Sequence, residues 1–249
     1  MTAVTSVFLI SVIFSMFGQG GGSVYTPMLF LLGYTALVSA STSLVLNLVT
    51  ALFATAVYHR EGLVNLRLAA SFVPGMVVGS FFGGAWGNFV DPEMLLWLFV
   101  AFLIGAGGRM VHTHWEKSVT NEAGEKRPPL LTYTVVGVFS LGVGILSGLL
   151  GMGGGILIVP FLIFACRVPT KQSAGTASFV VIFSSLFGVL GHSAFGHLDY
   201  GLVLPTLIAV AIGGTVGARF MVHTQSELVK FGFGLLMWAL AAQLIARLI

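Results

Sequence analysis

The sequence predicts an all-α polytopic membrane protein built from two homologous halves. Three observations predict it: the composition, a series of long apolar segments, and a nearly constant spacing between matching residues. The 249 residues are 57% hydrophobic and only 8% charged, whereas about a quarter of the residues in soluble domains are charged. A soluble fold of this size could not bury so much apolar surface, so lipid must cover part of it.

The apolar segments fall at 3–33, 38–58, 66–89, 93–111, 130–166, 172–191, 200–221 and 228–248. Most are long enough to cross about 30 Å of hydrocarbon as a helix. They must be helical there because no water is present to satisfy the backbone. The polar stretch 112–129 divides the chain. We therefore predict a first transmembrane repeat over 1–111, a cytoplasmic linker over 112–129 and a second transmembrane repeat over 130–249.

Two glycine-rich stretches interrupt the first and fifth apolar segments. They read "FGQGGGSVYTP" at 17–27 and "LGMGGGILIVP" at 150–160, and their glycines and prolines match at an offset of 133 residues. After a one-residue insertion, an offset of 134 pairs Ala40 with Ala174 and Thr42 with Thr176. So many matches at a nearly fixed offset predict an internal duplication.

The glycine breaks decide whether the two repeats run parallel or inverted. If the pieces around each break form one span, the repeats are parallel and Lys and Arg divide seven to four between the two sides. If the pieces form a re-entrant hairpin, the repeats are inverted and ten of these residues share one side, leaving Arg247 opposite. The positive-inside rule favours the second arrangement. We therefore expect inverted repeats, each with a Gly-broken helical hairpin plus about three transmembrane helices, and both termini outside.

The glycine breaks and the polar runs behind them form the predicted substrate site. Irregular backbone in a bilayer is tolerated only where protein buries it or where it lines a cavity. The segment after each break would offer free N–H groups and the positive end of a helix dipole to an anion. The runs "SASTS" at 39–43 and "SAGTAS" at 173–178 could add hydroxyl donors. The predicted substrate-binding residues are Gln19, Gly20, Gly21, Gly22, Ser23, Ser41, Thr42, Ser43, Asn47, Met152, Gly153, Gly154, Gly155, Gly175, Thr176 and Ser178.

Each of these residue types also has a structural interpretation. The hydroxyls could cap helices or form interhelical hydrogen bonds, and Asn47 could be a polar packing contact. Glycines can serve only to let helices pack closely, and this interpretation suits Gly75, Gly79 and Gly83, at four-residue spacing, better than the adjacent glycines of the breaks.

Other chemistry finds little support in the sequence. No Asp, Glu, Lys or Arg falls clearly at the centre of a span, which disfavours a cation substrate. His59 and His192 lie at predicted helix ends. They could act in gating or proton relay, or they could pack at the membrane interface. Cys166 is the single cysteine, and "HTHWE" at 112–116 is interpreted as a solvated linker, so we predict no metal and no cofactor. No catalytic motif and no nucleic-acid surface is recognisable, so we expect neither an enzyme nor a nucleic-acid partner.

The doubled motif resembles the TauE/SafE family of sulfite and organosulfonate exporters. The matching text is "GQGGGSVYTP" with "SASTS", "GMGGGILIVP" with "SAGTAS", and "GHSAFGHLDYG" at 191–201. The resemblance covers essentially the whole chain. It implies a secondary transporter, in the direction of export, that lies in the cell inner (plasma) membrane and carries small sulfur-containing anions such as sulfite, organosulfonates or thiosulfate. The expected partners are this anion and the lipid bilayer, and a homodimer is left open.

Two alternatives remain open at this point: an anion channel on the same scaffold, and a membrane scaffold protein that transports nothing. The chain also departs from the family pattern. The first polar run lacks the glycine before the threonine that the second run keeps as Gly175. Gln19 stands opposite Met152, and only glutamine can donate hydrogen bonds to an anion. The sequence therefore allows the two sites to be functionally unequal.

Overall fold

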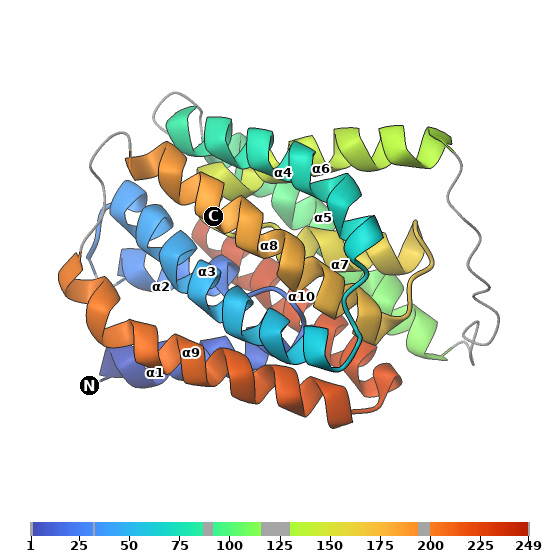
Figure 1. Ribbon diagram of the computed structural model, residues 1–249. Helices are drawn as coiled ribbons and strands as arrows, with labels where there is room; N and C mark the ends of the chain where they lie inside the picture. Colours follow the sequence, from blue (N-terminus) through green and yellow to red (C-terminus); the bar gives the residue numbers. More distant parts are fainter. Residues whose placement is uncertain (1, 32, 87–91, 116–129, 194–199, 249) are drawn as a thin grey trace.

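The computed structural model describes residues 2–31, 33–86, 92–115, 130–193 and 200–248, and all regular structure in these ranges is α-helical (Figure 1). The all-helical prediction is thereby confirmed. The helices are α1 (Thr2–Met16), α2 (Gly22–Leu31), α3 (Ala36–Arg60), α4 (Leu66–Trp86), α5 (Pro92–Trp115), α6 (Leu130–Leu150), α7 (Gly155–Phe164), α8 (Thr170–Ser193), α9 (Tyr200–His223) and α10 (Ser226–Leu248). Because α5 continues to Trp115, the first four residues of the predicted linker are helical; the other fourteen lie outside the described residues.

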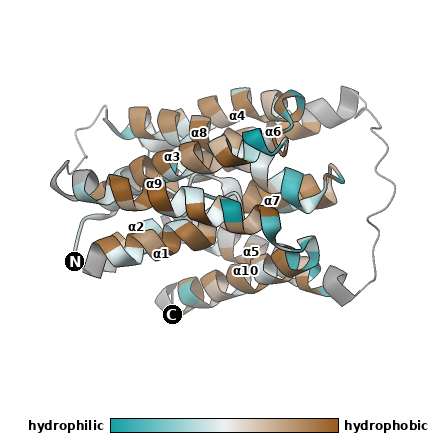
Figure 2. Cartoon of the chain, turned by 60° about the horizontal axis from the view of Figure 1, so that its bottom comes forward, coloured by the Kyte–Doolittle hydropathy of each residue, from teal (hydrophilic) through white to brown (hydrophobic). Residues whose placement is uncertain are grey.

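Among the described residues, five helices are long and apolar enough to cross a membrane. These candidate spans are Val38–Arg60, Leu66–Trp86, Thr170–His192, Pro205–His223 and Ser226–Ala246. The outer faces of the helices are apolar as well: Val138 is 70% exposed and Ile208 71%. Apolar residues extend along most of the helix lengths (Figure 2). Apolar surface on this scale marks a membrane contact.

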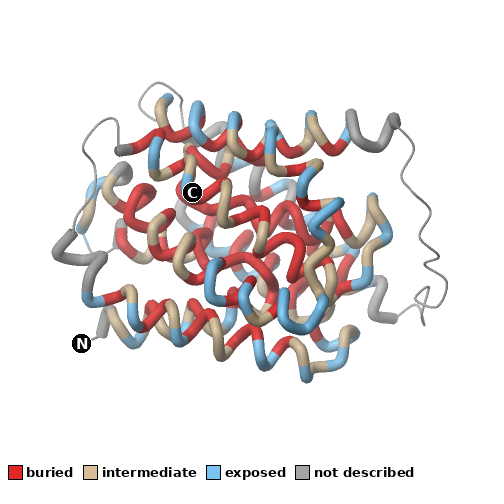
Figure 3. The backbone as a smooth tube through the Cα atoms, in the orientation of Figure 1, coloured by how far each residue is buried: buried red, intermediate tan, exposed pale blue. Residues whose placement is uncertain are grey.

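The helices α3 and α8 form the centre of the molecule. In each of them 61% of the residues in an apolar 18-residue stretch are buried, against 39–44% in the corresponding stretches of α4, α9 and α10. The two helices pack against each other; α4 packs on α6 and α8, α9 packs on α1 and α3, and α5 pairs with α10. Burial is accordingly greatest in the middle of the bundle (Figure 3). The polar runs that follow the glycine-rich stretches are therefore at the core.

Glycines bring α4 and α6 into close contact. A Cβ atom added to Gly79 would collide with the carbonyl oxygen of Leu141, and one added to Gly144 would lie 2.9 Å from the carbonyl oxygen of Met76. Any larger side chain would push the two backbones apart. The close-packing interpretation of the four-residue glycine spacing in α4 is confirmed.

One end of the bundle is basic. Lys171 Nζ donates to the carbonyl of Val222 at 2.6 Å, which joins the start of α8 to the end of α9. Arg109, near the end of α5, lies 4.6 Å from the ring centroid of Phe164 at the end of α7. The turn after α3 reaches the same place, because the N–H of Asn65 donates to Thr176 Oγ1 on α8. This basic end carries Arg60, Arg67, Arg109, Arg167, Lys171 and Arg219.

Candidate functional site

The two glycine-rich stretches form turns that need glycine. The first turn (residues 17–21) separates α1 from α2, and the second turn (residues 151–154) separates α6 from α7. Three glycines in each turn have positive φ, at positions 133 residues apart: Gly18 (72°), Gly20 (76°), Gly21 (102°), Gly151 (70°), Gly153 (69°) and Gly154 (74°). Only glycine adopts this conformation without strain. The backbone itself therefore requires the doubled motif.

The two turns lie face to face in the centre of the protein. A Cβ on Gly22 would lie 2.7 Å from the carbonyl carbon of Met152. A Cβ on Gly155 would lie 2.7 Å from the Cα atom of Gln19. Residues 151–160 are buried without exception. The starts of α2 and α7 thus meet where no bulk water reaches.

Each turn rests on a central helix from the other half of the chain. Gly18 packs against the backbone of Ala174 on α8, with 2.7 Å from its Cβ position to the Cα of Ala174. Gly151 packs in the same way against Ala40 on α3, at 2.6 Å from the Cα atom. These two alanines belong to the runs "SAGTAS" and "SASTS". The structure therefore brings the predicted glycine and polar segments together across the two halves.

Asn47 on α3 lies between the two turns. Its Oδ1 accepts the N–H of Gly22 at 3.2 Å, and its Nδ2 donates to Ser185 Oγ at 2.9 Å. The Cβ positions of Gly20 and Gly153 both collide with its amide. The side chain thus fills the space between the turns and links α2 to α8.

Three of the predicted hydroxyls have partners within the protein. Ser43 Oγ donates to the carbonyls of Gly22 (3.0 Å) and Gly151 (2.9 Å), which ties the two turns together. Ser41 Oγ donates to the carbonyl of Val38 at 3.2 Å. Thr176 Oγ1 accepts the N–H of Asn65 at the basic end. Their geometry suits the structural interpretation of these residues.

Other predicted site residues have buried polar side chains without a hydrogen-bond partner. Both amide atoms of Gln19 and the hydroxyls of Ser23, Thr42 and Ser178 are in this state. Buried polar groups are nearly always paired in native proteins. Of these, Gln19 and Ser23 lie beside the two helix starts and are available to a ligand.

Sequence reasoning missed three serines at the centre of the molecule. Ser147 Oγ, next to the second turn, is buried without a partner. Ser184 Oγ donates to the carbonyl of Gly153 at 2.7 Å, and Ser185 holds Asn47. The signal that could have identified the last two is an adjacent pair of serines in the apolar α8. Ser147 has no serine next to it, and the other serine of α6, Ser140, lies seven residues earlier.

The two predicted histidines have different surroundings. His59 is exposed at the basic end. His192 is 1% exposed, and its Nε2 lies 2.9 Å from the carbonyl oxygen of Gly148 near the end of α6. Tyr58, 134 positions before His192, makes the matching contact: its hydroxyl donates to the carbonyl of Ser15 near the end of α1 at 2.6 Å. Both side chains thus satisfy carbonyls at the end of a helix that stops inside the protein.

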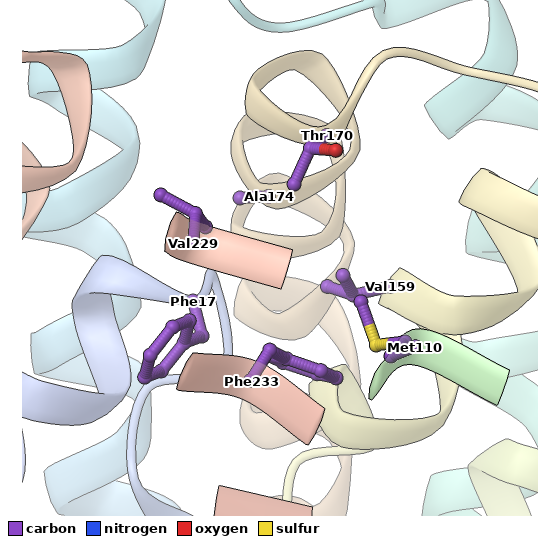
Figure 4. A pocket seen from close by; sticks show the side chains of 7 residues that line it. All are labelled: Phe17, Met110, Val159, Thr170, Ala174, Val229 and Phe233. Atoms are coloured by element: carbon purple, nitrogen blue, oxygen red, sulfur yellow. The ribbon is translucent and has the colours of Figure 1, made fainter. Parts of the chain in front are cut away.

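A narrow gap lies between the first turn and the start of α8 (Figure 4). It is lined by Phe17, Met110, Val159, Thr170, Ala174, Val229 and Phe233, and it is too narrow for a water molecule. The rings of Phe17 and Phe233 pack edge to face, with centroids 5.3 Å apart. Apolar side chains therefore fill the region beside the first turn.

Metal binding finds no support in the part of the chain that the structure describes. No group of three or more His, Cys, Asp or Glu side chains there could hold a metal ion. The polar atoms at the turns are amides, hydroxyls and backbone groups, which suit hydrogen bonding to an anion.

Helices that stop inside the protein around uncharged polar groups are typical of membrane transporters. Comparison with known proteins agrees: a family model described as "Sulfite exporter TauE/SafE" matches residues 3–244. The chain belongs to the sulfite exporter TauE/SafE family of membrane transporters.

Several curated proteins are similar over most of their length. A probable membrane transporter protein, YdhB, of Bacillus subtilis is 27% identical over 224 residues, which cover 88% of this chain and 89% of that protein. A probable membrane transporter protein of Xylella fastidiosa is 28% identical, covering 96% and 92%. The Arabidopsis thaliana "Sulfite exporter TauE/SafE family protein 6" is 36% identical over 49% of this chain and 30% of its own length. No solved structure matches.

Proposed function

We propose that this protein is a secondary transporter that exports small sulfur-containing anions, such as sulfite, organosulfonates or thiosulfate, across the cell inner membrane. The observation that carries the proposal is the pair of glycine turns that face each other with unpaired, buried polar groups beside them. Backbone N–H groups and helix dipoles would replace part of the hydration of the anion. A site without fixed charge suits transport, because the ligand must also leave.

We further propose that the chain consists of two inverted repeats, each with a re-entrant hairpin. Tyr25, in the first turn of α2, has its hydroxyl 3.5 Å from the carbonyl oxygen of Val7, more than two turns before the end of α1. This contact supports an α2 that runs back along α1. The packing of α1 on α9 has its counterpart in that of α6 on α4, and Tyr58 and His192 make matching contacts. Both sets of contacts support two related halves.

In this proposal, alternating access rocks one half against the other around the facing turns. The basic end is cytoplasmic by the positive-inside rule. The narrow gap beside Phe17 and Phe233 is then the closed route from the cytoplasm, and separation of these two rings opens it.

The experiment that tests the function is uptake of labelled sulfite, thiosulfate and methanesulfonate into liposomes that contain the purified protein, with and without a pH gradient. We expect saturable uptake of at least one of the three anions. Unitary currents in a planar bilayer would instead identify an anion channel. Protein that neither binds nor moves any of these anions would be the scaffold of the second alternative.

Cysteine labelling tests the orientation of the two hairpins. Thr35 follows α2 and Ala165 follows α7, and both are exposed. Each is replaced by cysteine in a Cys166→Ala background; burial raises the pKa of the native thiol, so its slow reaction would complicate the result. We expect an impermeant thiol reagent to label Thr35→Cys in intact cells and Ala165→Cys only after lysis. Equal labelling of both in intact cells would contradict inverted hairpins.

A further inference from the structure

The two helices that begin at the turns differ in how their first N–H groups are used. In α2 the N–H of Gly22 donates to Asn47 Oδ1. The second helix, α7, starts after Gly154, which has φ 74° and offers no side-chain cap. At an offset of 134 from Asn47 stands Val181, whose Cγ2 lies 3.0 Å from the Cβ position of Gly155. The N-terminus of α7 therefore has apolar carbon where α2 has an amide.

Two buried polar side chains without partners lie beside this uncapped helix start. Gln19 is 2% exposed, neither of its amide atoms has a partner, and its Cα lies 2.7 Å from the Cβ position of Gly155. Ser147 is 1% exposed, its hydroxyl is equally unpaired, and its Cβ lies 3.5 Å from the Cβ position of Gly154. The backbone of Gln19 and the Cβ of Ser147 thus both lie in contact with Gly154 and Gly155, at a helix start whose first N–H groups have no partner within the helix.

We infer that the anion binds at one place only, the N-terminus of α7, where Gln19 and Ser147 are the side chains that determine specificity. The inference rests on the proposed function and deepens it: the two turns do not share the ligand equally. The start of α2 is left out of this site because Asn47 already accepts the N–H of Gly22 there, although the buried Ser23 hydroxyl in the same turn is also unpaired. The ligand is a small oxyanion with at least two acceptor oxygens, one for the helix N–H groups and one for the Gln19 amide.

The role of Gln19 is tested with Gln19→Met, which puts the residue of the other turn at this position. Sulfite binding is measured by calorimetry on the purified protein, and transport is measured in liposomes. We expect the dissociation constant for sulfite to rise about tenfold or more, as expected for loss of a hydrogen bond to a charged group. Thermal stability should be unchanged or higher, because the variant removes two unpaired buried atoms. A lower melting temperature with unchanged affinity would reduce Gln19 to a packing residue and overturn the inference.

Three further variants separate a single site from a shared one. In the double variant Gln19→Met with Met152→Gln, the amide moves to the other turn; we expect it to bind sulfite as weakly as Gln19→Met. Restored affinity would show that the two turns are equivalent. Ser147→Ala should weaken binding several-fold, whereas Thr55→Val should not, although the Thr55 hydroxyl on α3 is also buried and unpaired. Equal effects of these two hydroxyl losses would also contradict the inference.

The readouts also separate this inference from the proposed function. Wild-type protein that binds sulfite but does not move it would refute transport while the variants still report on the site. Wild-type protein that moves sulfite with no response to Gln19→Met or Ser147→Ala would refute the single site alone. Wild-type protein that neither binds nor moves sulfite, thiosulfate or methanesulfonate would refute both.

Discussion

The two glycine turns share a backbone and differ in their side chains. In both, three glycines with positive φ stand at matching positions, and each turn rests on an alanine of the other half. The first turn has Gln19 and is followed by a helix that Asn47 caps; the second has Met152 and is followed by a helix without a cap. The same backbone conformation therefore occurs in both turns, whereas the polar side chains around the turns differ.

This difference shows how one scaffold can separate structure from ligand binding. Asn47, Ser43 and Ser185 hold the two turns together with hydrogen bonds that are complete within the protein. The side chains of Gln19 and Ser147 form no hydrogen bond within the protein. A buried polar group left unpaired lowers stability, and for this reason we assign these two side chains to the proposed anion.

The largest effect on transport and stability is expected for substitutions of the two turn glycines that contact Asn47. Gly20→Ala and Gly153→Ala each place a Cβ onto the Asn47 amide at a residue with positive φ. Left-handed strain costs about 1–2 kcal/mol, and overpacking adds about 1–3 kcal/mol. Both variants should lose transport and show a clearly lower melting temperature in detergent.

Gly62→Ala is the matched control for these two variants, because Gly62 has φ 67° and no atom within 4 Å of its Cβ position. Its free energy of unfolding should fall only by the backbone strain of about 1–2 kcal/mol. If Gly20→Ala and Gly153→Ala are no less stable than this control, the turns do not pack face to face on Asn47.

A smaller effect is expected when the second turn is made to resemble the first. In Val181→Asn the new amide would accept the N–H of Gly155, as Asn47 accepts that of Gly22. Capping this helix start should raise the sulfite concentration at half-maximal transport about tenfold, because the anion loses a donor to a neutral competitor. Val181→Ala creates a cavity without an amide and should lower stability only. An unchanged half-saturating concentration in Val181→Asn would place the anion elsewhere.

The smallest effect distinguishes paired from unpaired hydroxyls on neighbouring residues of α3. Ser43→Ala removes a donor to two carbonyls and should lower the free energy of unfolding by about 1 kcal/mol. Thr42→Val removes an unpaired buried hydroxyl and should leave stability unchanged or raise it. Thermal unfolding in detergent measures both. The opposite order would mean that the hydroxyl of Ser43 does not bridge the two turns.

Much of the architecture could be predicted from local sequence. The apolar segments predicted an all-helical membrane protein, and the glycine clusters predicted where the first and fifth segments break. The four-residue glycine spacing in α4 correctly predicted close packing, here against α6. These features depend on composition and short-range pattern, because the bilayer allows few alternatives to a helix.

Which polar side chains bind protein groups and which stay unpaired could not be predicted. The sequence grouped Ser41, Thr42, Ser43 and Asn47 as one set of candidate ligands, yet Ser43 and Asn47 bind protein groups and Thr42 binds none. It also paired His59 with His192, although Tyr58 makes the contact that matches that of His192. In each case the deciding partner is more than 20 residues away, or the atom has no partner at all.

The sequence by itself therefore determined the class of protein, the helical segments and the positions of two turns that only glycine can form. The tertiary structure decided that each turn rests on the opposite half, that Asn47 caps α2, and that the start of α7 stays uncapped beside Gln19 and Ser147. The physical reason is the range of the interactions involved. Backbone conformation and hydrophobicity are local properties, whereas the pairing of a buried polar atom depends on which distant helix packs against it.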